Sequence, residues 1–451
     1  MMKTTLIGHA CLLIQSKNCV LLTDPVFFDP HWEEINVLCP AVDLELDKVP
    51  EFDVLYLSHR HQDHFDVRTL AYLPKDRMVI APGDKVLLDV LKELGYRNVR
   101  VSEDFEPIKI KDLTLTPTPS ITQDPYPEHG LLIHDGEVAV WNQVDTIVTP
   151  KIVQYIQELY GRLDFAHVRF QPLIEGNFTF HKALELPFQE YASFLKVVKA
   201  LGPRFAVPGA AGFRYVDEFG FLNRYSFPTA PTQFIMDLAE FCPAVKTSLF
   251  NPGDVAEISR EGVKILPQNS DFVRVREDNG HLAEFKPVSE VYPIRTRTVE
   301  RNRQEEERTA VTRFIEEELL PRLKRTKMFE VWTHWRVVYQ LEVFGQDGSD
   351  IWSVDFGNEA RLEKGRIGKI NLYEGIACSE LYRLIKNETN WDFVGASAQY
   401  RTFHNVYRVA DGDIEFYPQA NKFPQPLMET FPQDDAMDRE KYLKDVRRWK
   451  K

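Results

Sequence analysis

Four side chains that are able to bind a metal ion lie within six consecutive residues of this 451-residue chain. They are His59, His61, Asp63 and His64, and they follow directly on the apolar run 52–57. Polar groups at the end of a core strand are costly when they have no partner. As ligands they would supply neutral nitrogen and anionic oxygen donors, which suit zinc or iron. This spacing therefore predicts a metal site rather than a solvated loop that happens to be rich in histidine.

The spacing of these residues also divides them between two metal positions. In an extended segment His59 and His61 point the same way, whereas Asp63 and His64 lie where the chain turns into a helix. Each pair can therefore hold one ion, and two-metal sites keep their ions about 3.5–4 Å apart. A fifth candidate ligand is Asp145, because its carboxylate lies at the exit of an apolar strand.

The H-x-H-x-D-H motif of residues 59–64 resembles the signature of the metallo-β-lactamase superfamily. The resemblance implies an α/β fold, a metallo-β-lactamase αββα sandwich, followed here by a C-terminal α+β domain. It also implies that Asp145 bridges the metals. The phrases around His9 (Gly-His-Ala) and Asp24 (Thr-Asp-Pro) are similar to those of the lactonase and phosphodiesterase branch, where such residues lie beside the metals. We expect both to orient the ligands from behind, although each taken alone reads as a hydrogen-bonded core residue.

The chain departs from the family pattern at two positions where relatives carry a histidine ligand. The first follows a Thr-Pro phrase, where this chain has Ser120 or Ile121, and the second precedes the helix expected over 187–201. The candidate replacements are His129 and Asp124 for the first position, and Glu185, His181 and, more weakly, Glu175 for the second. For each of them a surface or hydrogen-bonding role is an equal alternative. Without both histidines the site is richer in carboxylate, which favours iron or manganese over two zinc ions.

Alternating apolar and polar segments must position these residues. Strands are expected over 4–14, 20–24, 79–81, 99–101, 108–116, 130–133 and 137–142, and helices over 67–73, 84–94 and 187–201. Gly95 is expected to end the second of these helices, and a turn is expected at 134–136. Alternation of helices and strands implies sheets that are flanked by helices.

A connection over 203–232 is rich in glycine and proline and carries Arg214, Tyr215 and Arg224. The backbone amides and guanidinium groups of such a loop can bind an anionic group, so these three residues are candidate substrate contacts. A rigid aromatic connection with surface arginines is an equal alternative.

The composition changes after residue 265, which divides the chain into three predicted parts. Residues 1–265 would form the metal-binding catalytic domain, and residues 266–325 a charged helical linker with i,i+4 charge pairs. Residues 326–451 would form an aromatic-rich α+β domain and tail. In this part, strands are expected over 329–344, 350–356 and 367–372, and helices over 379–386 and 394–406.

The overall composition limits the partners of the chain. A net charge of −13 argues against broad binding to nucleic acid or to an anionic membrane. The five cysteines are odd in number and scattered, which fits a reducing compartment. Neither a signal peptide nor a run of transmembrane length is expected, so the predicted location is the cytoplasm. No Cys-x-His or Cys-x-x-Cys pair occurs, so an iron–sulfur cluster is not expected in this chain.

A second resemblance covers about residues 5–410. The order of several features along the chain resembles that in the catalytic portion of the CMP-N-acetylneuraminate hydroxylases, without their Rieske domain. These features are the motif 59–64, Val144-Asp145-Thr146, the loop 208–213, the phrase 251–254 and an aromatic C-terminal domain. This resemblance implies an iron site that activates O₂. It also implies electrons from a separate Rieske- or ferredoxin-type protein.

Three functions are open at this point. The first, which we favour, is an iron-dependent oxygenase that acts on a polar, anionic small molecule. The second is a dinuclear hydrolase of a lactone, amide or phosphodiester, in which Asp63 would be the catalytic carboxylate that binds metal and orients the attacking water. The third is a non-catalytic binding protein on the same fold. In both enzymatic hypotheses the cofactors are two divalent metal ions, with iron favoured and zinc or manganese as alternatives.

Overall fold

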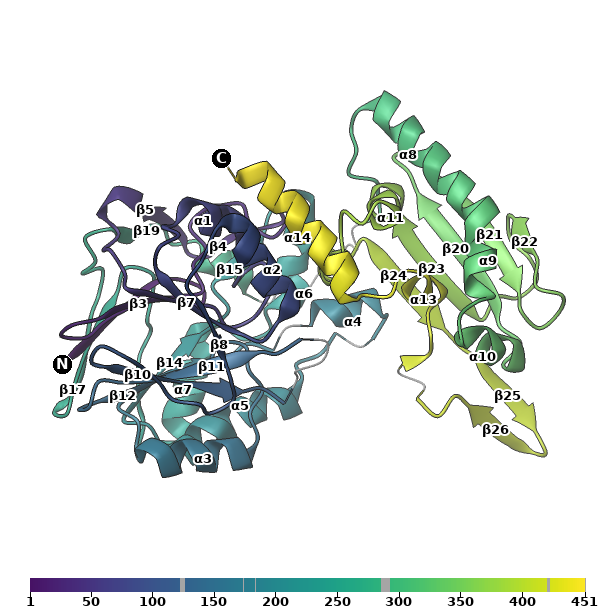
Figure 1. Ribbon diagram of the computed structural model, residues 1–451. Coiled ribbons are helices and arrows are strands. Elements are labelled where there is room, and N and C mark those ends of the chain that lie inside the picture. The colour runs from purple at the N-terminus through teal and green to yellow at the C-terminus, as the bar shows by residue number, and fades with distance from the viewer. Residues whose placement is uncertain (122–125, 173, 183, 285–292, 420–421, 451) are drawn as a thin grey trace. The chain divides into compact units, whose positions relative to one another are not determined.

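The computed structural model describes residues 1–450 except 122–125, 173, 183, 285–292 and 420–421, and the side chain of Glu175 is also outside the description. The chain divides into two compact units, each with its own sheets and helices (Figure 1). Unit 1 comprises Met1–Leu173, Glu185–Val288 and Tyr442–Lys451, and unit 2 comprises Ile174–Leu184 and Ser289–Lys441. The boundaries expected at residues 265 and 325 stay predictions.

Unit 1 is built on two large sheets. The first has the strand order β18-β17-β1-β2-β3-β6-β7-β8, with bounds Gly262–Leu266, Val255–Ser259, Met2–Gly8, Cys11–Gln15, Val20–Thr23, Val54–Tyr56, Met78–Pro82 and Val99–Ser102. The second has the order β16-β14-β13-β12-β11-β10-β9, with bounds Lys246–Thr247, Phe205–Gly209, Phe165–Arg169, Ala139–Asn142, His129–His134, Leu113–Pro119 and Ile108–Ile110. Two small ribbons pair β15 (Phe213–Tyr215) with β4 (Asn36–Leu38) and β19 (Val273–Glu277) with β5 (Ala41–Leu44).

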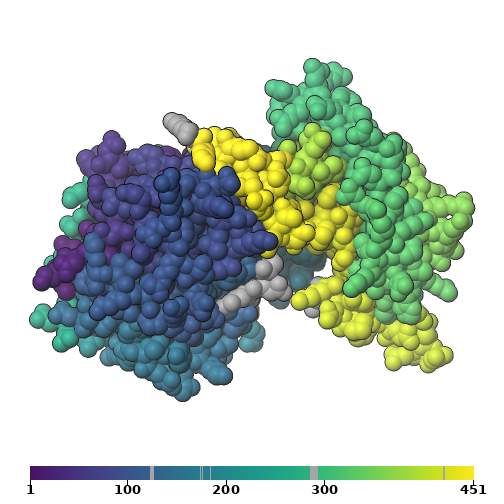
Figure 2. All heavy atoms as spheres, in the orientation of Figure 1, coloured from purple at the N-terminus to yellow at the C-terminus, as the bar shows by residue number. Residues whose placement is uncertain are grey.

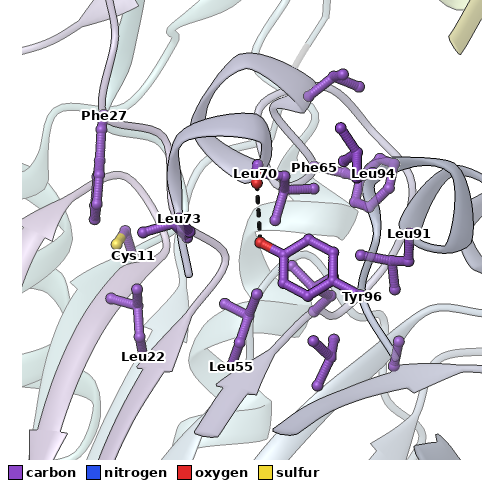
Figure 3. Packing of buried hydrophobic residues seen from close by; sticks show 14 of the residues in the cluster. Cys11, Leu22, Phe27, Leu55, Phe65, Leu70, Leu73, Leu91, Leu94 and Tyr96 are labelled. Carbon is purple, nitrogen blue, oxygen red and sulfur yellow. Dashed lines mark hydrogen bonds between the residues drawn. The ribbon is translucent and has the colours of Figure 1, made fainter. Parts of the chain in front are cut away.

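Apolar side chains fill three layers of unit 1. Between the two sheets, residues of both, such as Tyr56 and Val140, form one buried cluster. The outer face of the first sheet packs on α1 (Val67–Tyr72) and α2 (Lys85–Leu94), where the Tyr96 hydroxyl also donates to the Leu70 carbonyl at 2.9 Å (Figure 3). The outer face of the second sheet packs on α3 (Pro150–Tyr160), α5 (Phe188–Leu201) and α7 (Pro231–Phe241). This is an αββα sandwich, so the predicted α/β fold class is confirmed.

Local signals explain where the helices beside the motif begin and end. Asp66 caps α1 by accepting a hydrogen bond from the Thr69 amide, and Asp84 caps α2 by accepting from two amides of its first turn. Gly95 ends α2 at a φ of 96°, a left-handed conformation that glycine adopts without strain. The expected helix stop is therefore confirmed.

Three expected segments of unit 1 differ in the structure. The strand expected over 4–14 is two antiparallel strands, β1 and β2, because the chain reverses at His9, where φ is 50°. The strand expected over 108–116 is two strands, β9 and β10, because the chain turns at Lys111, where φ is 52°. The connection expected over 203–232 contains the buried strand β14, which pairs in parallel with β13 and β16. The glycine and proline content concealed this strand, since both residues are usually depleted in strands. The rest of the connection contains β15, a 3₁₀ turn η2 (Asp217–Leu222) and α6 (Asn223–Ser226).

Unit 2 contains a five-stranded sheet of order β22-β21-β20-β23-β24 and a ribbon β25-β26. The bounds are Leu362–Lys364, Ser349–Asp355, Val338–Phe344, Leu372–Ala377, Tyr400–His404, Tyr407–Ala410 and Asp413–Phe416. Its helices are α4 (Glu175–Thr179), α8 (Arg301–Arg313), a π-helical turn η4 (Phe314–Leu319), α9 (Leu320–Leu323), α10 (Met328–His334), α11 (Cys378–Ile385), α12 (Trp391–Ala396) and α13 (Pro426–Thr430). The last helix, α14 (Asp435–Trp449), begins in unit 2 and ends in unit 1.

Three predictions for unit 2 are wrong. The strand expected over 367–372 is a loop in which Gly368 has a φ of 46°, and β23 begins only at Leu372. The first part of the strand expected over 329–344 is α10, in which Phe329 and Trp332 lie one turn apart and both contact Phe356. The helix expected over 394–406 is the end of α12 followed by β24, where Tyr400 is buried and Phe403 is exposed in the alternation of a strand.

The cysteines and the helices also bear on the predicted environment. All five cysteines are free and buried, in agreement with the expectation of no disulfide framework. In the described part of the chain, no helix combines the length and the apolar character needed to span a bilayer.

Candidate metal centre

The motif of residues 59–64 lies at the end of β6, where the chain leaves the first sheet. The amides of His64 and Phe65 both donate to the carbonyl of His61, at 2.9 and 2.7 Å, so the chain turns tightly there. Phe65 then anchors the turn in the apolar cluster beneath α1. Asp145 follows β12 of the second sheet, after Val144 with a φ of 55°. Strand ends of both sheets therefore deliver polar side chains to the same place.

The side-chain donor atoms of five residues lie close together. The His64 Nε2 atom is 3.2 Å from Asp145 Oδ2, 3.0 Å from His9 Nε2 and 3.8 Å from Asp63 Oδ2. Two groups, His9-Asp63-His64 and His59-His64-Asp145, have donor atoms that all lie within 4.8 Å of one another. Donors bound about 2.0–2.2 Å from one ion are at most roughly 4.4 Å apart. The separations are thus of the size that a shared cation requires.

His61 adds a further donor beside these two groups. Its Nδ1 atom lies 2.8 Å from His59 Nε2. On its other side, its Nε2 atom is hydrogen-bonded to the hydroxyl of Tyr126. The hydroxyl therefore holds the ring so that Nδ1 faces His59.

An unpaired oxygen supports a cation at this place. Asp63 is only 4% exposed, and its Oδ1 atom has no hydrogen-bond partner among the described residues. A buried carboxylate oxygen without a partner is costly. A divalent cation would satisfy this oxygen, and the donor set of imidazoles and carboxylates fits zinc, iron or manganese.

The charges of the site favour an added positive charge. Burial by itself lowers the pKa of His64, but the carboxylates of Asp145 and Asp63 together raise it well above its ordinary value. In turn, although burial opposes the shift, His64 lowers the pKa of Asp145 and of Asp63 well below the usual range. For His59, burial and then the neighbouring imidazoles lower the pKa. The carboxylates therefore favour one more positive charge, which a proton on His64 or a divalent cation would supply.

Asp24 lies behind the motif in the orienting position expected for it. Its Oδ1 atom accepts from the Ser58 amide at 2.8 Å and its Oδ2 atom from the Ser58 hydroxyl at 2.7 Å. The same Oδ2 atom is 3.3 Å from His64 Nδ1, and the Ser58 oxygen is 2.9 Å from His59 Nδ1. Asp24 thus positions the rings of His64 and, through Ser58, of His59.

His9 lies closer to the candidate ligand atoms than a residue that only orients the ligands would. Its Nε2 atom is 3.3 Å from Asp63 Oδ2, among the donor atoms themselves. Its Nδ1 atom accepts a hydrogen bond from the Gly212 amide at 3.1 Å. A Cβ atom on residue 212 would lie 2.6 Å from the His9 amide nitrogen, so only glycine allows this approach. Because Nδ1 is an acceptor, the neutral ring carries its proton on Nε2 and directs it at the centre.

The structure does not bring the candidate replacement ligands into the two groups. The ring nitrogens of His129 contact Ser102 Oγ at 3.2 Å and Asp104 Oδ1 at 3.0 Å, because β11 directs the ring toward the edge strand β8. His181 belongs to unit 2, where its Nδ1 atom contacts the Thr402 carbonyl at 3.0 Å. Glu185 is exposed. Asp124 and the side chain of Glu175 lie outside the described residues.

The candidate substrate contacts lie on β15 and α6. Tyr215 is buried, only 2% exposed, in an aromatic group with Phe213 and Phe227. Arg214 is half-buried, and its Nε atom has no hydrogen-bond partner among the described residues. Arg224 is exposed. Of the three, Arg214 therefore retains an unused donor, whereas Tyr215 is part of the core.

Glu128 is a buried carboxyl that we did not anticipate from the sequence. Burial raises its pKa, the Asp145 carboxylate raises it further and the His61 imidazole lowers it, so Glu128 lies within electrostatic reach of both residues. It directly precedes β11 and stands next to His129. The only signal for Glu128 in the sequence is therefore that it is an acidic residue next to His129, a candidate ligand whose ring points away from the site.

His167 on β13 is a second residue that the sequence did not reveal. Its Nδ1 atom is 3.0 Å from Asn142 Oδ1, and its buried Nε2 atom has no partner among the described residues. Burial, and to a smaller extent the electrostatic interaction with His9, lower the pKa of His167 to about 3, so the His167 ring is neutral. A Cβ atom on Gly209 would lie 2.3 Å from this Nε2 atom, so glycine leaves the room that the ring fills.

Comparisons with known proteins match the part of the chain that contains the motif. Residues 3–131 match the family model described as a beta-lactamase superfamily domain. A Mycobacterium tuberculosis protein named as a Rieske 2Fe-2S iron-sulfur protein is 26% identical over 182 residues, which are 38% of this chain and 35% of that protein. The match thus spans about a third of the length of this relative.

Two solved structures align with more than half of this chain. A metallo hydrolase from Ignicoccus hospitalis shares 19% identity over 56% of this chain and 97% of that chain, with a TM-score of 0.41. A diiron β-hydroxylase from Streptomyces venezuelae shares 17% identity over 59% of this chain and 54% of that chain, with a TM-score of 0.40. Residues 3–131, which contain the motif 59–64, are therefore a beta-lactamase superfamily domain.

Proposed function

We propose that unit 1 holds a dinuclear metal centre around His64. One ion would be bound by His59 Nε2 and His61 Nδ1, which lie 2.8 Å apart. Because one nitrogen binds one ion, His64 Nε2 would serve the second ion together with Asp63. Asp145, with Oδ2 3.2 Å from His64 Nε2, would bridge the two ions.

Glu128 would complete this ligand set as a further carboxylate. Its burial and its electrostatic interactions with Asp145 and His61 make it the candidate for this role. The centre would then contain three carboxylates and three imidazoles. Such a set favours iron or manganese over zinc.

The activity that we propose is that of an iron-dependent oxygenase or hydroxylase. The observation that carries this proposal is that the proposed ligands of the first ion, His59, His61 and Asp145, combine two imidazoles with one carboxylate. Two histidines and one carboxylate with open positions are the ligand set of non-haem iron oxygenases. When bound, iron would activate dioxygen for the hydroxylation of a substrate.

His9 would act as a hydrogen-bond donor within this centre. The Gly212 amide fixes the proton of the neutral His9 ring on Nε2, and this atom faces the donors at 3.0–3.3 Å. It would donate to an oxygen atom of the substrate or co-substrate. Tyr126 would keep His61 in its ligating orientation through the hydrogen bond to Nε2.

A separate electron donor and an anionic substrate belong to the same proposal. Curated relatives carry the name of a Rieske iron–sulfur protein, whereas the five cysteines of this chain have no iron–sulfur spacing. Electrons would therefore come from a Rieske- or ferredoxin-type partner. The substrate would be a polar anion, for which the unused Nε donor of Arg214 is the first candidate and the exposed Arg224 the second.

A dinuclear hydrolase of a lactone, amide or phosphodiester is the second candidate. It is favoured by the unpartnered Oδ1 atom of the buried Asp63, which would orient a water molecule. Two histidines and a carboxylate are also the ligands of zinc hydrolases. The metal therefore decides between the two candidates.

Metal analysis and oxygen uptake together test the proposal. The metal-free chain would be reconstituted under nitrogen with Fe²⁺ or with Zn²⁺, and oxygen uptake would be followed with a chemical reductant. The oxygenase predicts reductant-dependent oxygen uptake by the iron form alone. Turnover of a chromogenic lactone or phosphodiester by the zinc form, without oxygen uptake by the iron form, would identify the hydrolase. A chain that retains neither metal would contradict both candidates.

A further inference from the structure

The last residues of the chain pack against the metal-binding motif. They form the end of α14 and belong to unit 1. Tyr442 and Val446 are each 3% exposed and share an apolar cluster with Phe65. In Figure 2 the yellow C-terminal turn lies against the dark blue residues that include α1 and α2. We call residues 442–450 the C-terminal clasp.

The C-terminal clasp contacts two residues of the motif and Phe65, the residue that follows it. The Tyr442 hydroxyl donates to the carbonyl oxygen of Arg60, and its ring meets the Phe65 ring edge-on at 5.7 Å between centroids. The Oδ2 atom of Asp445 accepts from Gln62 Nε2 at 3.3 Å.

These three residues alternate with the proposed ligands along the chain. Arg60 stands between the two histidines of the first pair, Gln62 precedes Asp63, and Phe65 follows His64. Every proposed ligand of the motif is thus next to a residue that the clasp holds.

Arg60 is fixed from two sides. Its Nε atom is 2.7 Å from Asp84 Oδ2 at the start of α2, and both side chains are buried. Its carbonyl oxygen is held by Tyr442. The backbone between His59 and His61 therefore has little freedom to rotate.

The clasp has its own anchors away from the motif. The Arg68 guanidinium lies 5.4 Å from the centroid of the Trp449 ring, and the Lys450 amine donates to the Glu93 carbonyl. Arg448 forms an exposed ion pair with Glu34 at 3.4 Å. Arg68 belongs to α1 and Glu93 to α2, so the first two contacts place the clasp on these helices, whereas the exposed Arg448 pair contributes little.

We propose that the C-terminal clasp is a positioning element of the metal centre and that Tyr442 is its principal positioning residue. Ligands that are held in place before the metal arrives lose less conformational freedom on binding, so the affinity is higher. Residues that orient ligands from behind typically change metal affinity about 10–100-fold when they are replaced. This inference rests on the metal centre proposed above.

The test is a Co²⁺ titration of the metal-free full-length chain, followed by the visible absorption of the bound ion. Tyr442→Phe keeps the ring on Phe65 and removes only the hydroxyl. We expect it to weaken Co²⁺ binding about tenfold and to change the absorption of bound Co²⁺, which reports coordination geometry. Asp445→Asn should weaken binding in the same direction. Arg448→Ala, on the exposed side of the clasp, is the matched control and should bind as the wild type does.

The outcomes of this titration are read as follows. The inference is supported when Tyr442→Phe changes Co²⁺ affinity and absorption while the metal-free variant retains the wild-type circular dichroism. It is overturned when the variant loses thermal stability but binds Co²⁺ with unchanged affinity and absorption, because the clasp would then serve stability alone. Should Tyr442→Phe fail to fold, Asp445→Asn is judged by the same two readouts. A wild-type chain that binds no Co²⁺ would instead overturn the metal centre itself, so the two failures are distinguishable.

Discussion

His64 lies between two carboxylates, and both groups of donor atoms depend on its Nε2 atom. Its Nδ1 atom is oriented by Asp24 at 3.3 Å. In the proposed centre this nitrogen binds one ion only, so the other ion would depend on the pair His59 and His61. The two ions are therefore expected to bind with different affinities, as they have different numbers of buried carboxylates beside them.

Removal of a proposed ligand should empty the site. We expect His59→Ala and Asp145→Ala each to lower the bound metal by at least half and to abolish activity, because both residues belong to the group His59-His64-Asp145. Metal content after gel filtration, measured by plasma emission spectrometry, checks this. Glu185→Ala is the matched control, since Glu185 is exposed and belongs to neither group. Full metal occupancy in His59→Ala or Asp145→Ala would refute the assignment.

Glu128 and His129 offer a comparison between neighbours. We expect Glu128→Gln to lower metal content and activity at least tenfold, because it removes a buried negative charge close to Asp145 and His61. His129→Gln should leave the metal content unchanged, because the ring contacts Ser102 and Asp104. Equal losses in the two variants would contradict the proposed role of Glu128.

Single residues explain why the site was only partly predictable. The spacing of residues 59–64 pointed to a metal because four potential ligands, three histidines and one aspartate, lie together at the end of one strand. Glu128 was missed because an acidic residue before a strand has no distinctive pattern. His167 was missed because it sits inside an apolar strand, and only the small Gly209 on the neighbouring strand shows why it fits.

At the scale of elements, α2 and the motif share one buried ion pair. Asp84 both caps α2 and accepts from the Arg60 guanidinium at 2.7 Å. We expect Asp84→Ala to lower the free energy of unfolding of unit 1 by about 3–5 kcal/mol, because it removes the charged partner of a buried guanidinium. Urea denaturation followed by circular dichroism measures the change.

Asp84→Asn separates the two roles of this residue. Asparagine caps helices about as well as aspartate, so this variant retains the cap and loses only the charge. We expect it to be destabilised less than Asp84→Ala but clearly more than the wild type. An Asp84→Ala protein that loses under 1 kcal/mol would show that the ion pair contributes little.

The elements were predicted best where one pattern dominated. The helix over 84–94 had both a cap and a glycine stop, and α2 ends as expected. The segment 329–334 is aromatic, and aromatic residues suggested a strand, but the one-turn spacing of Phe329 and Trp332 forms a helical face against Phe356. The contact with Phe356 favours the helix over the strand, and a contact with so distant a residue cannot be read from the sequence of the segment 329–334.

At the scale of the whole molecule, unit 2 contains a buried carboxyl of its own. Glu374 on β23 accepts from the Tyr400 hydroxyl at 2.5 Å and from the Leu427 amide at 3.0 Å, at the start of α13. Burial raises its pKa from 4.5 to about 7, although the hydrogen bonds from Tyr400 and Leu427 act in the opposite direction. The folded chain therefore holds this proton more tightly than the unfolded chain does.

The stability of unit 2 should fall as the pH rises. Between pH 4.5 and 7 the unfolded chain releases the Glu374 proton first, so stability is lost over this range, by roughly 3 kcal/mol in all. Glu374→Gln should abolish this part of the pH dependence. Urea midpoints of the two proteins at pH 4.5 and pH 8 measure it, and equal pH dependence in both would contradict the prediction. Other titrating groups are common to both proteins and cancel in the comparison.

The hydrogen bond from Tyr442 to Arg60 has a consequence for synthesis. The ribosome makes the motif some 380 residues before the clasp. At usual rates of translation the two are separated by roughly 20–80 seconds. During this interval the nascent histidines are without the contact that steadies them, so metal loading is expected to follow synthesis of the clasp rather than precede it.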